Sequence, residues 1–166
     1  MIRTFQTHKR RSCWETYPDT RNYRGKASYK RTFEGSGNIR LEFKGVSHTA
    51  EVYVDGEKVA EHYNAYTIFD TVLKDLLPGT HTLEVLADNS FGEASALHVP
   101  NDYQSYGGIS RPVVLEELGA VYVKWVHFTP QAKEAGESWQ GKAEICLCSL
   151  SEKPFRGTLE LNLGEK

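Results

Sequence analysis

The run N-D-Y-Q-S-Y-G-G-I-S-R at 101–111 holds the residue types best suited to recognition chemistry. The carboxylate of Asp102 is an acceptor-only group that can hold two hydroxyl donors through charge-assisted hydrogen bonds. The same side chain could instead cap its own backbone in an Asn-Asp turn. Ser90 to Tyr106 shows no sustained hydrophobic period, and a connection this long in a compact domain is usually functional or disordered. We favour a function for it.

Other catalytic and metal sites are not indicated. The six histidines occur singly, without the close pairings that supply zinc ligands. The chain has no glycine-rich phosphate loop, no G-x-S-x-G turn and no cysteine–histidine nucleophile signature. We therefore expect neither a metal ion nor a cofactor.

Composition and charge narrow the class of protein. The chain has 166 residues, enough for about one domain, and no apolar run approaches the roughly 20 residues of a membrane helix. Its three cysteines are an odd number, which favours a reducing, cytoplasmic setting. Residues 1–31 carry nine Lys or Arg, with aromatic residues between them, as single-strand nucleic-acid surfaces do. Part of this excess is the His8–Arg11 run, which we expect to be solvated, so we predict no nucleic-acid partner.

The segments around Asp102 are predicted to be β-strands. Hydrophobic and polar residues alternate in four runs, at 27–33, 39–43, 50–54 and 81–87, and a further strand is expected after Asp55-Gly56, from Val59. Asp55-Gly56 is typical of a two-residue hairpin, because both central positions of a type I′ turn need positive φ. We expect a bend at Asn64 to Asp70 and a break at Leu76 to Gly79, where Pro-Gly ends a strand. Residues 1–12 show no strand pattern.

The order of these segments resembles the amino-terminal jelly-roll domain of family 2 glycoside hydrolases, the β-galactosidases and β-glucuronidases. Three features carry the resemblance: the Asp55-Gly56 hairpin after a V-x-V strand, the bend Tyr66-Thr67-Ile68-Phe69, and the run from Asp102 to Arg111. It covers most of residues 13–118. The resemblance implies an all-β fold with a jelly-roll, galactose-binding-domain-like β-sandwich, whose first strand is missing or replaced here.

The resemblance also implies roles for individual residues. In the family, the aspartate that corresponds to Asp102 accepts hydrogen bonds from ring hydroxyls of the sugar in the cleaved position. Asn101 stands where relatives often have His, which leaves the identity of the sugar open. Tyr103 and Tyr106 either line the cleft or pack under the loop, and packing is favoured. Arg111 is expected to support the loop rather than to touch the substrate.

We expect two domains, at 1–119 and 120–166. The second resembles the opening of the immunoglobulin-like sandwich that follows the jelly roll in the family, with predicted strands at 121–130, 141–149 and 157–163. Such a sandwich needs about seven strands and roughly 100 residues. The chain is therefore expected to hold only its beginning, with apolar faces exposed.

The resemblance implies that the parent protein is a retaining β-glycosidase of carbohydrate metabolism, a hydrolase acting on O-glycosyl bonds. Such enzymes use two glutamates about 5–5.5 Å apart, and in this family both belong to a later (β/α)₈ barrel. The chain has no Asn-Glu dipeptide, the pair that carries the family's acid/base residue. We expect the chain to be inactive by itself and to supply a substrate-contacting loop to an active site completed elsewhere.

The expected partner is a β-linked sugar, a β-galactoside or a β-glucuronide. Two alternatives stay open, because a fold alone does not settle function. One is a stand-alone carbohydrate-binding module. The other is a structural domain that holds the subunits of a homo-oligomer together, since many relatives associate through these domains.

Overall fold

The computed structural model describes residues 2–5, 12–92, 106–132 and 138–162. It divides into two compact units, residues 1–118 and 119–166. Within the described ranges, no helix is long and apolar enough to cross a membrane. The elements are β1 Ile2–Phe5, β2 Ser12–Cys13, the 3₁₀ helices η1 Trp14–Thr16 and η2 Pro18–Thr20, β3 Lys26–Phe43, β4 Val46–Ser47, β5 Thr49–Val54, β6 Glu57–Tyr63, β7 Phe69–Asp88, β8 Gly108–Ile109, β9 Val113–Leu118, β10 Val121–Ala132 and β11 Trp139–Ser149.

Two long antiparallel strands, β3 and β7, pair along their whole length and form the centre of the first unit. The predicted break at Leu76 to Gly79 is wrong, because β7 runs through it and absorbs the extra residues as bulges. The register shifts lie opposite Gly35 and Gly37, and Pro78 falls inside one of them. A proline in a bulge has no ladder hydrogen bond to donate, so the strand continues past it.

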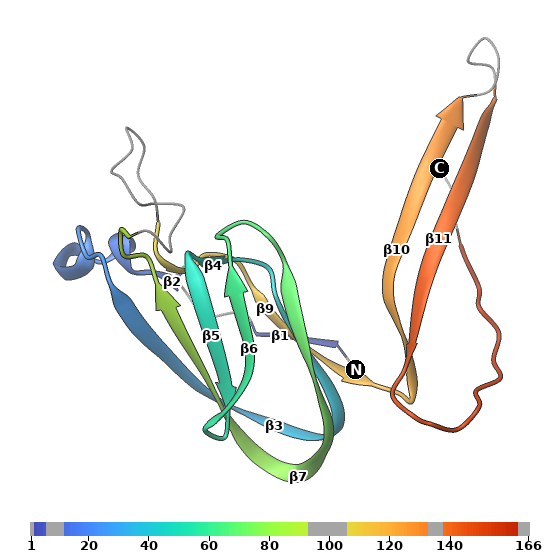
Figure 1. Cartoon of the computed structure of the whole chain (residues 1–166), viewed down its shortest axis with the longest axis horizontal. Coiled ribbons are helices and arrows are strands. Elements are labelled where there is room, and N and C mark those ends of the chain that lie inside the picture. Colours follow the sequence, from blue (N-terminus) through green and yellow to red (C-terminus); the bar gives the residue numbers. More distant parts are fainter. Residues whose placement is uncertain (1, 6–11, 93–105, 133–137, 163–166) are drawn as a thin grey trace. The chain divides into compact units, whose positions relative to one another are not determined.

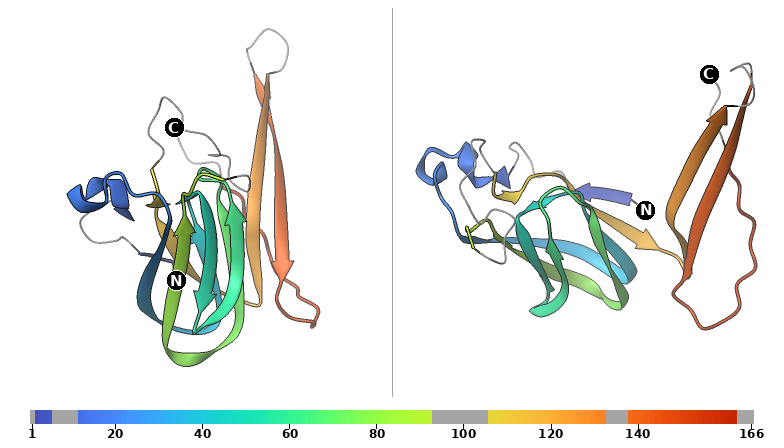
Figure 2. Two further views of the ribbon diagram at one scale, coloured as in Figure 1. Left: turned by 60° about the vertical axis from the view of Figure 1, so that its left-hand side comes forward. Right: turned by 45° about the horizontal axis from the view of Figure 1, so that its top comes forward.

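The bend at these bulges turns one six-stranded sheet, of order β1-β9-β3-β7-β5-β6, into the two layers of a sandwich. Figures 1 and 2 show β3 and β7 curving from one layer into the other. β9 pairs with the second half of β3, whereas β5 pairs with the second half of β7. The two layers share one core, whose most buried side chains include Ile39, Leu41, Phe43, Val52, Val85 and Leu115. Burying each such side chain contributes about 1.5–3 kcal/mol.

β1 is a strand that the sequence analysis did not predict. Ile2–Phe5 pairs antiparallel with residues 113–116 of β9. Four residues are too few to show a clear period, and the pairing covers an edge of β9 that would otherwise be open. The expectation of no strand in residues 1–12 is therefore wrong for Ile2–Phe5.

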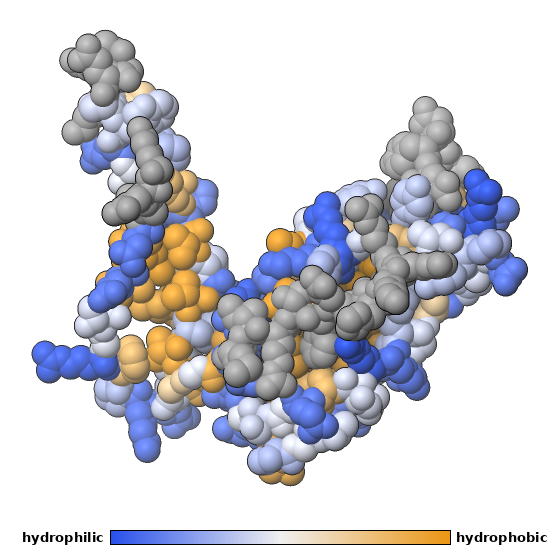
Figure 3. Space-filling view, turned by 180° about the vertical axis from the view of Figure 1, so that it is seen from behind, coloured by the Kyte–Doolittle hydropathy of each residue, from blue (hydrophilic) through white to orange (hydrophobic). Residues whose placement is uncertain are grey.

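The strands among the described residues of the second unit form one antiparallel hairpin, β10–β11. β10 continues through Pro130, which pairs with Gly141, although the sequence analysis placed the end of the strand there. The strand predicted at 157–163 is not formed in residues 157–162. One face of the hairpin is apolar, and Figure 3 shows apolar residues gathered on it. The cross-strand pairs of this face are Val123–Leu147, Val126–Ile145 and Phe128–Ala143.

The predicted hairpin turn is confirmed. Val54 pairs with Glu57, and φ is 51° at Asp55 and 87° at Gly56. Asp55 also ties the turn to β7, because its Oδ1 accepts a hydrogen bond from the backbone N–H of Thr82 at 2.7 Å. The turn therefore holds β5 and β6 in register and joins them to the neighbouring strand.

His81 completes this anchor. Its Nδ1 lies 2.6 Å from Oδ2 of Asp55 and its Nε2 lies 2.8 Å from the carbonyl oxygen of Leu77. Both ring nitrogens face acceptors, so the doubly protonated ring satisfies both. The hydrogen bond to Asp55, followed by the one to Leu77, raises the pKa of His81 above its ordinary 6.5. The backbone N–H of Thr82 and then His81 lower the pKa of Asp55 below its ordinary 3.8.

His81→Gln should destabilise the protein more at pH 5.5 than at pH 9. The raised pKa means that the stability supplied by His81 is fully present below its unfolded pKa of about 6.5 and is lost as the pH rises through the folded pKa. We expect a loss of about 0.5–1 kcal/mol at pH 5.5, discounted for the half-exposed carboxylate. Urea unfolding at both pH values measures it, with the exposed His127→Gln as control. An equal loss at the two pH values would contradict the assignment.

Candidate functional site

The residues singled out by the sequence fall into two groups. Asp102, Asn101 and Tyr103 lie outside the described residues, and their roles stay predictions. Tyr106 and Arg111 are described, and both line one pocket of about 360 Å³. Tyr106 is 51% exposed, so its ring is accessible from solvent at this pocket.

Short backbone pairings build this pocket. β8 pairs with β2 on one side and with β4 on the other, which brings Cys13, Gly108 and Ser47 together. The carbonyl oxygen of Gly45 accepts hydrogen bonds from the backbone N–H groups of Ser110 and Arg111, at 3.1 and 3.3 Å. These bonds fix the point from which the side chain of Arg111 leaves the backbone.

The pocket lining suits a hydroxylated ligand that carries a negative charge. The guanidinium of Arg111 donates one hydrogen bond, to the carbonyl oxygen of Tyr66 at 3.4 Å, and forms no ion pair with a carboxylate among the described residues. A guanidinium presents five donors in a planar fork that matches a carboxylate. Tyr66 and Tyr106 add exposed aromatic rings. The described residues that line the pocket are Cys13, Thr16, Ser47, Ala65, Tyr66, Tyr106, Ser110 and Arg111.

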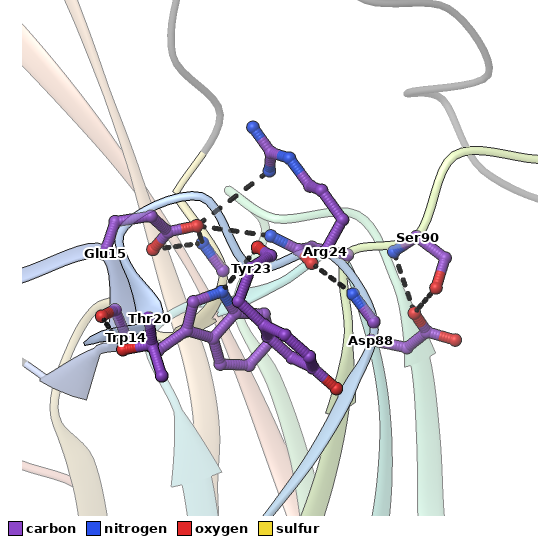
Figure 4. Close-up of polar contacts among 10 residues, drawn as sticks. Trp14, Glu15, Thr20, Tyr23, Arg24, Asp88 and Ser90 are labelled. Carbon is purple, nitrogen blue, oxygen red and sulfur yellow. Dashed lines mark hydrogen bonds and ion pairs between the residues drawn. The ribbon is translucent and has the colours of Figure 1, made fainter. Parts of the chain in front are cut away.

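A hydrogen-bonded cluster includes Glu15 and Gly107, which are adjacent in sequence to Thr16 and Tyr106 of this lining (Figure 4). Both carboxylate oxygens of Glu15, in η1, accept a hydrogen bond from the backbone N–H of Gly107, at 2.8 and 2.9 Å. Oε1 of Glu15 also accepts from Nδ2 of Asn89 at 3.2 Å and lies 3.9 Å from the guanidinium of Arg24. We call Glu15, Arg24, Asn89 and Gly107 the stem cluster, because Asn89 and Gly107 flank segment 90–106.

Trp14 packs against the stem cluster. Its side chain is buried, its ring lies edge-on to that of Tyr23 with centroids 5.5 Å apart, and its indole N–H donates to the carbonyl oxygen of Tyr23 at 3.2 Å. A Cβ atom on Gly107 would lie 2.1 Å from the Trp14 ring and 2.4 Å from Nδ2 of Asn89. The close approach of these groups therefore requires glycine at position 107.

The stem cluster is not predicted by the sequence. Glu15 lies within the basic segment 1–31, for which no site is predicted. An available signal was its place directly after Trp14, since a carboxylate beside a large buried ring needs nearby donors. The donors themselves, Asn89 and Gly107, lie 74 and 92 residues away and could not be paired with it by spacing.

Two titratable side chains near the pocket, those of His48 and Tyr29, are uncharged at pH 7. Burial lowers the pKa of His48, which follows Ser47 of the pocket, so its ring is neutral at pH 7. Burial, and then Cys13, raise the pKa of Tyr29, so its phenol is also neutral. In the part of the chain that the structure describes, no group of three or more His, Cys, Asp or Glu side chains is arranged to hold a metal ion.

Comparison with known proteins identifies the family. The Glycosyl hydrolase 2 galactose-binding domain-like family matches residues 6–127. The chain belongs to this family. The predicted all-β, jelly-roll fold class and the resemblance to family 2 glycoside hydrolases are thereby confirmed.

Relatives of this domain are named as β-glycosidases. A GH2 beta-galacturonidase from Eisenbergiella tayi, solved with galacturonate bound, is 63% identical over 90% of this chain, with a TM-score of 0.80. A putative beta-glucuronidase from Formosa agariphila is 29% identical over 61% of the chain. A beta-galactosidase from Thermoanaerobacterium thermosulfurigenes is 31% identical over 65%. The chain spans 28%, 12% and 16% of these relatives' own lengths, respectively.

Gly107→Ala should displace the backbone of the stem cluster and destabilise the domain by about 1–3 kcal/mol, the usual effect of forcing a group into a packed site. Urea unfolding followed by tryptophan fluorescence measures the loss. Gly92→Ala is the matched control, because a Cβ atom there meets nothing within 4 Å. Equal stability of the two variants would mean that Gly107 is not held against Trp14.

Proposed function

We propose that this chain is the amino-terminal, sugar-binding-fold part of a retaining β-glycosidase whose substrate is a β-linked hexuronic acid of the galacturonide type. The observation that carries this proposal is the 63% identity over 90% of the chain with a beta-galacturonidase solved with galacturonate. The relatives at 29–31% identity are named for glucuronides and galactosides. At this level of sequence identity, these relatives support the assignment to the β-glycosidases but do not identify the sugar of the substrate.

In this proposal the chain contributes recognition and leaves bond cleavage to other residues. Asp102, in segment 90–106, accepts hydrogen bonds from two hydroxyl groups of the sugar, a task that suits an acceptor-only carboxylate. The acid/base and nucleophile glutamates of a retaining enzyme are supplied by a barrel elsewhere in the protein. The chain by itself is then inactive.

A second candidate function, carbohydrate binding by this chain alone, is favoured by the pocket around Arg111. Its volume of about 360 Å³ lies within the usual range of roughly 300–1,000 Å³ for small-molecule sites. The guanidinium of Arg111 can meet a sugar carboxylate, and the ring of Tyr66 can meet the apolar C–H groups of a sugar ring.

Asp102→Ala, made in the longer protein that carries this chain, should lower kcat/KM for a chromogenic β-galacturonide by about a hundredfold or more, the effect of losing two hydrogen bonds to a charged group. The exposed Asp19→Ala is the matched control. The proposal expects hydrolysis of the β-galacturonide to exceed that of the β-glucuronide and β-galactoside. Turnover by the 166-residue chain alone, or an Asp102→Ala variant as active as Asp19→Ala, would contradict it.

Sugar binding at the pocket is measured in the 166-residue chain and needs no catalytic reaction. Titration with galacturonate, followed by nuclear magnetic resonance, should shift the amide signals of Ser110 and Arg111. Arg111→Met should weaken this binding about tenfold, the size of one charge-assisted hydrogen bond, whereas the exposed Arg156→Met should not. Equal binding of galactose and galacturonate would contradict the contact between Arg111 and the sugar carboxylate. If neither sugar shifts these amide signals, the pocket does not bind the sugar and the second candidate function fails.

A further inference from the structure

Residues 64–68, which connect β6 to β7, contain a strained backbone at Asn64. Its φ is 118°, far beyond the left-handed value of about 57° that asparagine tolerates. A residue in such a conformation costs free energy, and the conformation persists only where the surrounding structure determines it. We call residues 64–68 the Tyr66 bend.

Hydrogen bonds hold the backbone of the Tyr66 bend. The N–H of Asn64 donates to the carbonyl oxygen of His48 at 3.0 Å. The side-chain Oδ1 of Asn64 accepts a hydrogen bond from the N–H of Tyr66 at 2.9 Å, and the carbonyl oxygen of Tyr66 accepts one from the guanidinium of Arg111 at 3.4 Å. Both backbone polar groups of Tyr66 are therefore paired, which fixes the point from which its ring leaves the backbone.

Gly45 allows the Tyr66 bend to lie close to Arg111. A Cβ atom on Gly45 would lie 3.2 Å from the carbonyl oxygen of Ala65 and 3.2 Å from Cδ of Arg111, so a side chain there would require these groups to move. Ala65 is buried, whereas Tyr66 is 67% exposed. Both line the pocket of about 360 Å³ with Arg111, near β4 (Figure 1). The bend thus buries its smallest side chain and leaves its aromatic ring at the pocket.

Stability does not account for this arrangement. A ring that stays largely exposed buries little apolar surface, so the burial of Tyr66 offsets little of the strain at Asn64. Strained residues cluster at sites that hold ligands, because a group already fixed in its bound position loses less freedom on binding. The Tyr66 ring is therefore fixed in advance for a ligand in the pocket.

We propose that Tyr66 selects the sugar at this pocket by stacking on the ring of a β-galacturonide, and that Asn64 is the positioning residue that holds it there. This inference rests on the second candidate function, the binding of a sugar acid beside Arg111. Galacturonate and glucuronate carry the same carboxylate, so the guanidinium of Arg111 attracts both alike. A preference between them has to come from a group that contacts the sugar ring.

The two sugars differ in the hydroxyl group on the fourth ring carbon. In a β-galacturonide this hydroxyl is axial, so the C–H groups of the third, fourth and fifth carbons lie together on the opposite face. In a β-glucuronide the hydroxyl is equatorial, and the C–H groups are divided between the two faces. The negative face of an aromatic ring binds best to a continuous surface of C–H groups. Tyr66 therefore favours the β-galacturonide.

The role of Tyr66 is tested in the 166-residue chain by titration with methyl β-galacturonide and methyl β-glucuronide, followed through the amide signals of Ser110 and Arg111. The chain should bind the galacturonide about threefold to tenfold more tightly, the size of one aromatic contact. Tyr66→Ala should bring the two affinities within about twofold of each other. Phe155→Ala, which removes an exposed ring of the second unit, is the control and should keep the preference.

The outcomes separate this inference from the function on which it rests. Equal binding of the two sugars by the unchanged chain, or a preference that survives Tyr66→Ala, would overturn the role of Tyr66 and leave the candidate function standing. If neither sugar binds, the second candidate function fails, and the inference fails with it.

The role of Asn64 is tested by a variant that separates binding from stability. Glycine adopts this φ without strain but has no side chain to accept the N–H of Tyr66. Asn64→Gly should therefore unfold at an equal or higher urea concentration, and yet bind the β-galacturonide about threefold more weakly, because Tyr66 is less firmly held. Asn64→Asp, which keeps the acceptor, should retain the affinity, as should Asp75→Gly at another residue of positive φ. Binding by Asn64→Gly as tight as that of the unchanged chain would overturn the positioning role.

Discussion

The antiparallel pairing of β3 with β7 is the interaction on which the rest of the first unit depends. Each strand contributes to both layers of the sandwich, so every other strand of the large sheet pairs, directly or through a neighbour, with one of these two. The bulges around Gly37 divide the pair in the middle. A straight pair of this length would have left its apolar face open to water. The bend lets the two halves of the same pair bury each other.

The bend also explains where the site lies. When a pair of strands is folded at its middle, its two ends return to the same end of the sandwich. The outer end of the pair, Lys26 with Asp88, continues into Gly25 and Asn89 of the stem contacts. The inner end, at Phe43, continues into Gly45, which holds Ser110 and Arg111. The short β2-β8-β4 sheet connects these two places, so the pocket and the stem cluster are products of one fold rather than two separate features.

A feature of the fold could be predicted from the sequence when its signal lies in neighbouring residues. Alternation within four runs and the Asp55-Gly56 turn depend on neighbouring residues, and both were found correctly. The continuity of β7 through Pro78 depends on a bulge set by the opposite strand, and β1 depends on the free edge of β9. Neither the strand opposite Pro78 nor the free edge of β9 can be identified from a short stretch of sequence. The family was found because its motifs combine several local signals in a fixed order.

The stem cluster could not be predicted from local sequence patterns either, because its side-chain contacts join residues far apart in the chain. Glu15 is informative only together with Gly107 and Asn89, and both contacts arise from the folded sandwich. Hydrophobic burial there is already supplied by Trp14, which covers the cluster. A carboxylate in the same place costs desolvation, which its two hydrogen-bond donors, Gly107 and Asn89, offset only when both lie in the observed positions. The group thus makes the stability of this end of the domain depend on the placement of Asn89 and Gly107 beside Glu15, which an apolar side chain of equal size would not do.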